Sequence, residues 1–267
     1  MRTLVVRLGA LGDAVLTLPA LAHLVAEGDE VAVLGVPASW AFLPADGRLR
    51  IEDADTSRWR GLFAGESVEA ARAFDRAIVM LRVAPALGMP MVHVPPIRPG
   101  ERGEPAARRL LRGVGGSTID PDAVRALIAP DAGGDPHDLV LHPGSGGRTK
   151  RWPAARFAEL ARRARSPLVL LGPADDDLVA DFAGLAVARN WPLRRVVAAL
   201  AATHAFVGND SGVSHLASWL CPALALFGPT DPAVWAPAGP QARVLAAPDG
   251  DLARLAVDEV ARALDRL

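Results

Sequence analysis

Apolar and polar positions follow two alternating periods along the chain. Short and almost uninterrupted apolar runs predict β-strands at residues 3–8, 30–36, 77–81, 91–94, 139–142, 168–171, 205–207 and 223–227. Between them, apolar residues recur with the 3.6-residue period of an α-helix, most clearly over residues 13–26, 153–165, 175–183 and 252–267. Strands that are apolar throughout and alternate with helices are typical of parallel sheets covered on both faces. The pattern therefore predicts an α/β fold.

A cluster of helix- and strand-breaking residues interrupts this pattern at Asp131-Ala132-Gly133-Gly134-Asp135-Pro136. It predicts two domains of similar length, residues 1–134 and 135–267, each Rossmann-like. The closing helix at 252–267 could pack back on the first domain. We expect the two parallel sheets to face each other across a cleft, because ligands of open α/β sheets bind beyond the carboxyl ends of the strands.

Composition narrows the classes of function. The chain has 267 residues, 51% of them hydrophobic, and a net charge of −1, which argues against a nucleic-acid-binding protein. One cysteine, Cys221, excludes an internal disulfide framework and makes a reducing cytoplasm the default location. No apolar run reaches the length of a membrane span or has the flanks of a signal peptide. We expect a soluble, cytoplasmic protein.

Lys150 is the only lysine among 29 basic residues. It follows the glycine-rich stretch Pro143-Gly144-Ser145-Gly146-Gly147, between a predicted strand and a predicted helix. Backbone N–H groups, a hydroxyl and a mobile ammonium in such a turn are suited to an anion such as phosphate. The order of residues is not that of a Walker motif, which disfavours a nucleoside triphosphatase. The alternative is an ordinary connection with a solvated lysine.

A second polar group, Asn209-Asp210-Ser211-Gly212, ends another predicted strand and leads into a helix. The first-turn N–H groups of that helix, from Gly212 and Val213, and the nearby His215 would face the same anion. The alternative is that Asp210 or Ser211 only caps the helix while His215 packs in the core.

The turn after the first predicted strand, Gly9-Ala10-Leu11-Gly12-Asp13, offers an acid. Asp13 could act as a general base, or it could simply cap the following helix. The spacing is not that of a dinucleotide-binding fingerprint. Asp175, in an acidic turn after another strand, could accept hydrogen bonds from a ribose diol or could be a solvated helix-start charge.

These segments together resemble glycosyltransferase family 9, the ADP-heptose:lipopolysaccharide heptosyltransferase family. The resemblance is carried by residues 11–13 with 16–21, 142–153, 171–173, 208–212 with 215–217, and 227–232. It covers most of the C-terminal half and only the start and scattered patches of the N-terminal half.

The resemblance implies a GT-B fold and an inverting transfer of heptose from ADP-heptose to an acceptor hydroxyl, without a metal ion or other cofactor. The residues carried over comprise Asp13 as catalytic base, Ser145, Gly146, Lys150, Gly212 and Val213 as diphosphate ligands, and Asp210, Ser211 and His215 near the donor sugar and phosphates. Asp175 would bind the nucleoside. Trp191 and Leu193 are our candidates for the side chains that line the site of its base.

The first half is short for this family, which leaves the acceptor open. It could be a carbohydrate, a small soluble molecule, or a glycolipid at the inner face of the inner membrane. Arg98, Arg102, Arg108 and Arg112 could bind acidic acceptor groups, or they could form a solvated arginine-rich face. Two other functions stay open: a GT-B-type nucleotide-sugar epimerase or hydrolase, and a non-catalytic nucleotide-sugar-binding module.

Overall fold

The computed structural model of the protein describes residues 1–44, 48–97 and 100–267. This described chain divides into two compact units, Met1–Ile128 and Ala129–Leu267. The predicted boundary between residues 134 and 135 lies slightly further along, in the segment that leads into the first strand of the second unit. Each unit contains its own parallel sheet and its own hydrophobic core.

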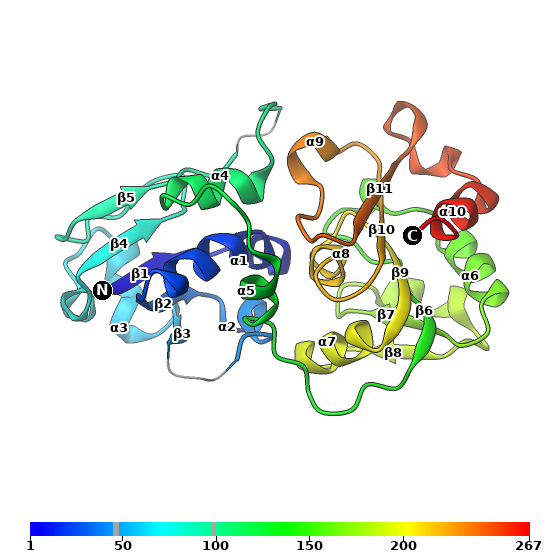
Figure 1. The fold of residues 1–267 in the computed structure, drawn as a ribbon, viewed down its shortest axis with the longest axis horizontal. Coiled ribbons are helices and arrows are strands. Elements are labelled where there is room, and N and C mark those ends of the chain that lie inside the picture. Colours follow the sequence, from blue (N-terminus) through cyan, green and yellow to red (C-terminus); the bar gives the residue numbers. More distant parts are fainter. Residues whose placement is uncertain (45–47, 98–99) are drawn as a thin grey trace. The chain divides into compact units, whose positions relative to one another are not determined.

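The described part of the first unit contains a five-stranded sheet with the order β3-β2-β1-β4-β5, in which every pairing is parallel (Figure 1). The strands are β1 (Arg2–Val6), β2 (Glu30–Gly35), β3 (Leu49–Asp53), β4 (Arg76–Val79) and β5 (Met91–His93). The helices are α1 (Leu11–Ala26), α2 (Pro37–Trp40), α3 (Ser57–Phe63), the 3-10 helix η1 (Glu69–Ala73), α4 (Ala106–Gly113) and α5 (Pro121–Arg125).

Strand β1 shows why this sheet needs helices on both faces, because Thr3, Leu4, Val5 and Val6 are all completely buried. Leu4 and Val6 belong to a core that includes Trp59 of α3. The alternating side chains of a strand point to opposite faces. Val5 therefore faces the other side of the sheet, the side of α1, against which α4 and α5 pack.

The second unit contains a six-stranded parallel sheet in its described residues, with the order β11-β10-β9-β6-β7-β8. The strands are β6 (His137–His142), β7 (Pro167–Leu171), β8 (Val187–Arg189), β9 (Thr203–Asn209), β10 (Ala223–Phe227) and β11 (Ala242–Ala246). The α-helices are α6 (Ala154–Arg163), α7 (Leu193–Ala201), α8 (Gly212–Ala217), α9 (Pro232–Trp235) and α10 (Val257–Leu264). The 3-10 helices are η2 (Arg148–Lys150), η3 (Asp176–Phe182), η4 (Pro248–Gly250) and η5 (Leu252–Arg254).

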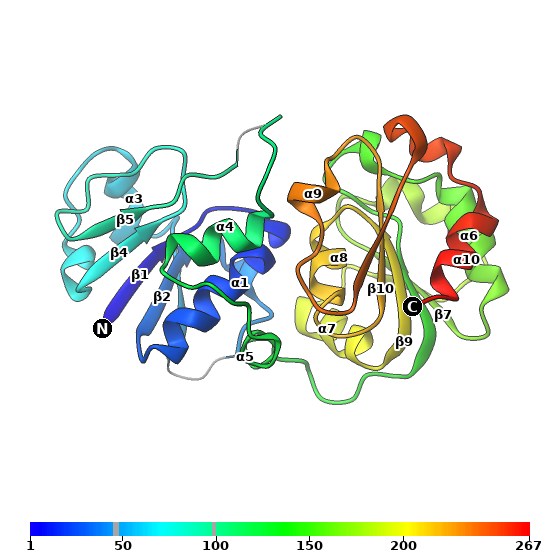
Figure 2. The same ribbon diagram turned by 45° about the horizontal axis from the view of Figure 1, so that its top comes forward.

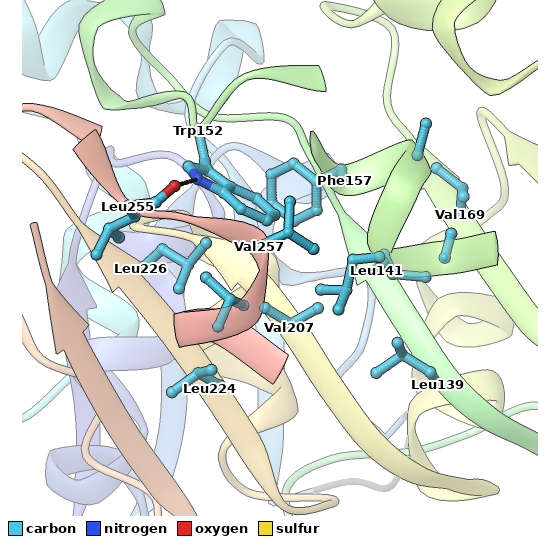
Figure 3. Close-up of a cluster of buried hydrophobic side chains, with 14 of the residues drawn as sticks. Leu139, Leu141, Trp152, Phe157, Val169, Val207, Leu224, Leu226, Leu255 and Val257 are labelled. Carbon is cyan, nitrogen blue, oxygen red and sulfur yellow. Dashed lines mark hydrogen bonds between the residues drawn. The ribbon is translucent and has the colours of Figure 1, made fainter. Parts of the chain in front are cut away.

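Within this unit, α7 and α8 pack on one side of the strands and α6 and α10 on the other (Figure 2). The core between the sheet and α6 is centred on Trp152, which is fully buried and meets Phe157 edge to face with ring centroids 4.8 Å apart. The Trp152 indole N–H donates to the Leu255 carbonyl at 3.0 Å (Figure 3). Val257 and Val260 of α10 also lie in this core, so the closing helix contributes to the second unit.

Two predicted helices were wrong in detail. Residues 175–183 form the 3-10 helix η3, and residues 252–267 form η5 and α10 separated by Leu255 and Ala256, which are not helical. Three strands were not predicted at all, namely β3, β8 and β11.

Cys221 lies in the core of the second unit, with 2% exposure. Burial raises the pKa of its thiol to about 12, which makes it an inert apolar side chain. None of the helices in the part of the chain that the structure describes is long and apolar enough to cross a membrane.

Candidate functional site

The predicted donor-site residues of the second unit lie on loops that leave neighbouring strands at the same edge of the sheet. Strands β6, β9 and β10 are adjacent and parallel, so the loops that follow their carboxyl ends emerge side by side. This is the edge at which open α/β sheets bind ligands. The three loops carry Lys150, Asp210 and Thr230, respectively.

These three side chains meet at one carboxylate oxygen. Lys150 Nζ lies 2.7 Å from Asp210 Oδ2, and the Thr230 hydroxyl donates to the same oxygen at 2.7 Å. The Asp210 side chain is 7% exposed, whereas that of Lys150 is 34% exposed. The ion pair therefore fixes the ammonium at the surface of the loop and leaves part of it open to a ligand.

The glycine-rich loop before Lys150 is attached to the same place. The Ser145 hydroxyl donates to the main-chain carbonyl of Asp210 at 2.9 Å, so it serves the loop's own structure. Gly146 is exposed, and within the described residues its N–H has no protein partner. Main-chain donors of this loop, rather than the serine hydroxyl, are the groups free to meet an anion.

Asn209 holds both ends of this loop and was missed by the sequence analysis. Its amide group donates to the Pro143 carbonyl at 2.8 Å, and its carbonyl accepts the N–H of Trp152 at 2.9 Å. Asn209 is fully buried. The sequence does show a side chain that can both donate and accept hydrogen bonds. It does not show with which groups, because the two partners lie 66 and 57 residues away along the chain.

Ser211 is the N-cap of α8, and its oxygen accepts the N–H of Ser214. The capping role that the sequence left open for Asp210 or Ser211 thus falls to Ser211. Gly212 and Val213 occupy the first turn of this short helix, as predicted, and His215 follows with 5% exposure. His215 is a mostly buried residue with its backbone N–H bonded to the Ser211 carbonyl.

Asp175 is engaged on both carboxylate oxygens. One accepts the Gly172 N–H at 2.9 Å and the other meets Arg151 at 3.1 Å, in a pair whose side chains are 5% and 14% exposed. Gly144 lies against this carboxylate, because a Cβ at Gly144 would lie 2.3 Å from Asp175 Oδ2. In this structure Asp175 therefore joins the turn after β7 to the Lys150 loop.

The residues proposed to line the site of the nucleobase follow β8, an edge strand of the same sheet. Trp191 is half-buried, and the guanidinium of Arg195 lies over its ring at 3.8 Å from the centroid. Leu193, also half-buried, begins α7.

Asp13 belongs to the first unit, in the first turn of α1, where it makes no capping bond. Its Oδ1 accepts from Arg7 Nη2 at 2.5 Å, and its side chain is 39% exposed. Burial lowers the pKa of Arg7, and the charge of Asp13 acts in the opposite direction. Asp13 is thus a partly exposed carboxylate paired with a buried guanidinium.

Among the candidate acceptor-binding arginines, Arg98 lies outside the described residues. Arg102 and Arg108 are exposed. Arg112 forms a two-pronged ion pair with Glu104, which lowers the pKa of Glu104. The described residues contain no cluster of three or more His, Cys, Asp or Glu side chains suited to a metal ion.

The chain is similar in sequence and in fold to known proteins. The model of glycosyltransferase family 9 (heptosyltransferase) matches residues 120–259, more than half of the chain. Lipooligosaccharide heptosyltransferase 2 of Haemophilus ducreyi is 31% identical over 126 residues, which are 41% of this chain and 36% of that protein. The alignable stretch is thus little more than a third of that relative's length.

Two solved structures share the fold at 20% identity and a TM-score of 0.74. They are E. coli ADP-heptose LPS heptosyltransferase II, where the match covers 100% of this chain and 98% of the other, and E. coli heptosyltransferase WaaC with ADP-2-deoxy-2-fluoro heptose, where it covers 100% and 99%. The predicted GT-B class, with two parallel-sheet α/β units, is confirmed. On the family match over residues 120–259, this chain belongs to glycosyltransferase family 9.

Proposed function

We propose that the protein is an inverting glycosyltransferase that moves heptose from ADP-heptose to an acceptor hydroxyl. The observation that carries the proposal is the convergence of Lys150, Asp210 and Thr230 on the loops after β6, β9 and β10, inside the region that matches the family. The WaaC structure named above, with an ADP-heptose analogue, supports the choice of donor.

The diphosphate would be held by Lys150, the N–H of Gly146 and the first-turn N–H groups of Gly212 and Val213. A lysine ammonium is a compact point charge, and a helix start presents unpaired N–H donors, so both favour a bound anion. These groups would also stabilise the ADP that leaves, because negative charge grows on the bridging phosphate oxygen as the sugar departs.

Asp210 suits the sugar better than the phosphates. A buried carboxylate would repel a diphosphate, but it can accept hydrogen bonds from sugar hydroxyls while it holds Lys150 in place. His215 and the main chain around Ser211 would complete that side of the donor. Trp191 and Leu193 would flank the nucleoside, and Asp175 would reach the ribose only by giving up a present partner.

Asp13 would act as the base. It takes the proton from the acceptor hydroxyl while the acceptor oxygen forms a bond to the anomeric carbon and the bond from that carbon to the diphosphate breaks. One direct displacement of this kind inverts the anomeric configuration.

The acceptor is proposed as a carbohydrate, in the form of either a soluble molecule or a glycolipid at the cytoplasmic face of the inner membrane. The relatives' names refer to lipooligosaccharide and lipopolysaccharide. The exposed Arg102 and Arg108 would be available to acidic acceptor groups, whereas Arg112 would have to exchange Glu104 for them. No metal ion is needed, because lysine and main-chain donors supply the charge stabilisation.

Binding of ADP to the wild type, K150M and D13N separates the two halves of the proposal. A nucleotide that binds the folded state raises the melting temperature by mass action. We expect stabilisation by ADP in preference to UDP, GDP and dTDP, unchanged by EDTA. We also expect K150M to weaken ADP binding by at least tenfold and D13N to leave it within twofold. A wild type that no nucleotide stabilises would refute the proposal.

The alternatives predict other fates for ADP-heptose when it is mixed with the wild-type protein. A nucleotide-sugar epimerase or hydrolase would consume ADP-heptose without an acceptor. A binding module would bind ADP but consume no ADP-heptose under any condition.

A further inference from the structure

We propose that Arg7 is a positioning residue for Asp13, which fixes the carboxylate through one oxygen and leaves the other oxygen to take the acceptor proton. This inference rests on the proposed function for its catalytic meaning. The pair itself is a property of the first unit and can be tested without the reaction.

Hydrogen bonds to two neighbouring strands hold Arg7 at the end of a third. It directly follows β1, and its backbone N–H donates to the Leu34 carbonyl of β2 at 3.0 Å. Its Nη1 donates to the carbonyl of Met80, the residue that follows β4, at 3.1 Å. The side chain is 8% exposed. A guanidinium held at both ends in this way has one conformation and presents Nη2 to Asp13 at a fixed place.

The two carboxylate oxygens of Asp13 are not equivalent. Oδ1 is bound by Arg7, whereas Oδ2 has no hydrogen-bond partner among the residues that the structure describes. Gly9 makes room for this second oxygen, since a Cβ at Gly9 would lie 2.3 Å from Oδ2. With the side chain 39% exposed, Oδ2 is the oxygen that an acceptor hydroxyl could reach.

Arg7 is too deeply buried to bind an acceptor directly, although its Nε has no hydrogen-bond partner among the described residues. Burial works against its charge, and Asp13 is the ionised group that compensates it. Of the helices that pack on α1, α2 contributes no charged side chain. Within the described residues, Arg7 forms an ion pair only with Asp13. Arg7 and Asp13 form a local unit, and removing one member changes the other.

The test compares R7M and R7K with the wild type in the full-length protein. R7M removes the donor that fixes the Asp13 carboxylate, so kcat should fall on the order of a hundredfold while KM for ADP-heptose stays within about twofold. R7K keeps a donor at this place but loses the fork that reaches both Asp13 and Met80. It should therefore recover part of the loss, with kcat on the order of tenfold below the wild type. The dissociation constant for ADP should be unchanged in both.

R2M is the matched control. Arg2 lies at the other end of β1 and also pairs with an aspartate, Asp75, but that pair is largely exposed, with side chains 52% and 41% accessible. R2M should leave kcat and KM unchanged. Circular dichroism spectra and melting curves identify any variant that fails to fold.

A measurement without turnover keeps the inference separate from the proposed function. The side-chain carboxyl carbon of Asp13, assigned through D13N in aspartate-labelled protein, is observed by ¹³C NMR at one neutral pH in the wild type, R7M and R2M. We expect its signal to shift or broaden in R7M, where the hydrogen bond that fixes the carboxylate is lost, and to stay unchanged in R2M. An unchanged Asp13 signal in R7M, or a wild-type kcat of R7M in a protein that transfers heptose, would overturn the inference. A wild type without transfer activity would refute only the proposed function.

Discussion

Asn209 illustrates how one buried side chain can hold a whole ligand loop. Its side-chain NH2 group donates a hydrogen bond to Pro143 at the start of the Lys150 loop. Its side-chain oxygen accepts one from Trp152 at the end of that loop. The sequence predicts that Lys150, Asp210 and Asp13 are functional residues, because an isolated charge beside a glycine turn is a local signal. It does not predict the roles of Asn209, Thr230 or Arg7, because these roles depend on partners that only the fold brings close.

We expect N209A to cost about 2–4 kcal/mol of unfolding free energy, because two buried backbone groups lose their partners. Urea denaturation measures this change. D176N is the control, since the Asp176–Arg189 pair is exposed, with side chains 66% and 52% accessible, and should change stability by no more than about 0.5 kcal/mol. Equal stability of N209A and D176N would show that Asn209 does not hold the loop.

The burial of His142 leads us to predict that the stability of the protein depends on pH. Burial lowers the pKa of His142, and its Nδ1 faces the Leu170 carbonyl at 3.0 Å, which fits a neutral ring that donates. As pH falls through about 6.5, the unfolded chain gains a proton at this residue that the folded protein does not, so stability is lost below that pH.

In H142Q that contribution disappears. We expect the free energy of unfolding to fall less steeply between pH 7 and 5 than in the wild type, by up to about 1.4 kcal/mol per pH unit. Urea titrations at several pH values give the two slopes. Parallel slopes would mean that His142 is protonated equally in both states.

At the scale of elements, the turn after β7 supports the Lys150 loop. Asp175 binds Arg151, next to Lys150, and Gly144 packs against the Asp175 carboxylate. The acidic turn was predicted to bind ribose, and that role stays a prediction. The role of Asp175 that this structure shows is to connect the turn after β7 with the Lys150 loop.

G144A should destabilise the protein by about 1–3 kcal/mol, because the new methyl group must displace the Asp175 carboxylate or the loop itself. G147A, in the same loop, is the matched control, because a Cβ there meets nothing within 4 Å. Chemical denaturation of both variants compares them directly. A G144A protein as stable as G147A would mean that the loop shifts without cost.

Most of the strands that the sequence predicted are more buried than those it missed, although the exposed edge strand β5 was predicted as well. Strands β1, β2, β9 and β10 lie inside their sheets and are almost continuously apolar, so their pattern is strong. Strands β3, β8 and β11 are edge strands with mostly half-exposed side chains, so no apolar run marks them. Residues 175–183 have helical spacing of apolar positions but tighten into a 3-10 helix after the Asp175 turn.

At the scale of the molecule, division into two α/β units could be predicted because each half repeats the strand–helix pattern around its own core. The proposed mechanism uses a base from the first unit and donor ligands from the second. Within each unit, sequence order alone cannot show which loops meet, because parallel strands bring distant loops to one edge only after folding.

The most direct test of the account is the fate of ADP-heptose with purified protein, followed by NMR with and without a core-type carbohydrate acceptor. We predict that ADP is released only when the acceptor is present and that the new glycosidic bond has the anomeric configuration opposite to that of the donor. D13N should lose at least a hundredfold in rate while it still binds ADP. ADP release without acceptor, retention of configuration, or full activity of D13N would contradict the account.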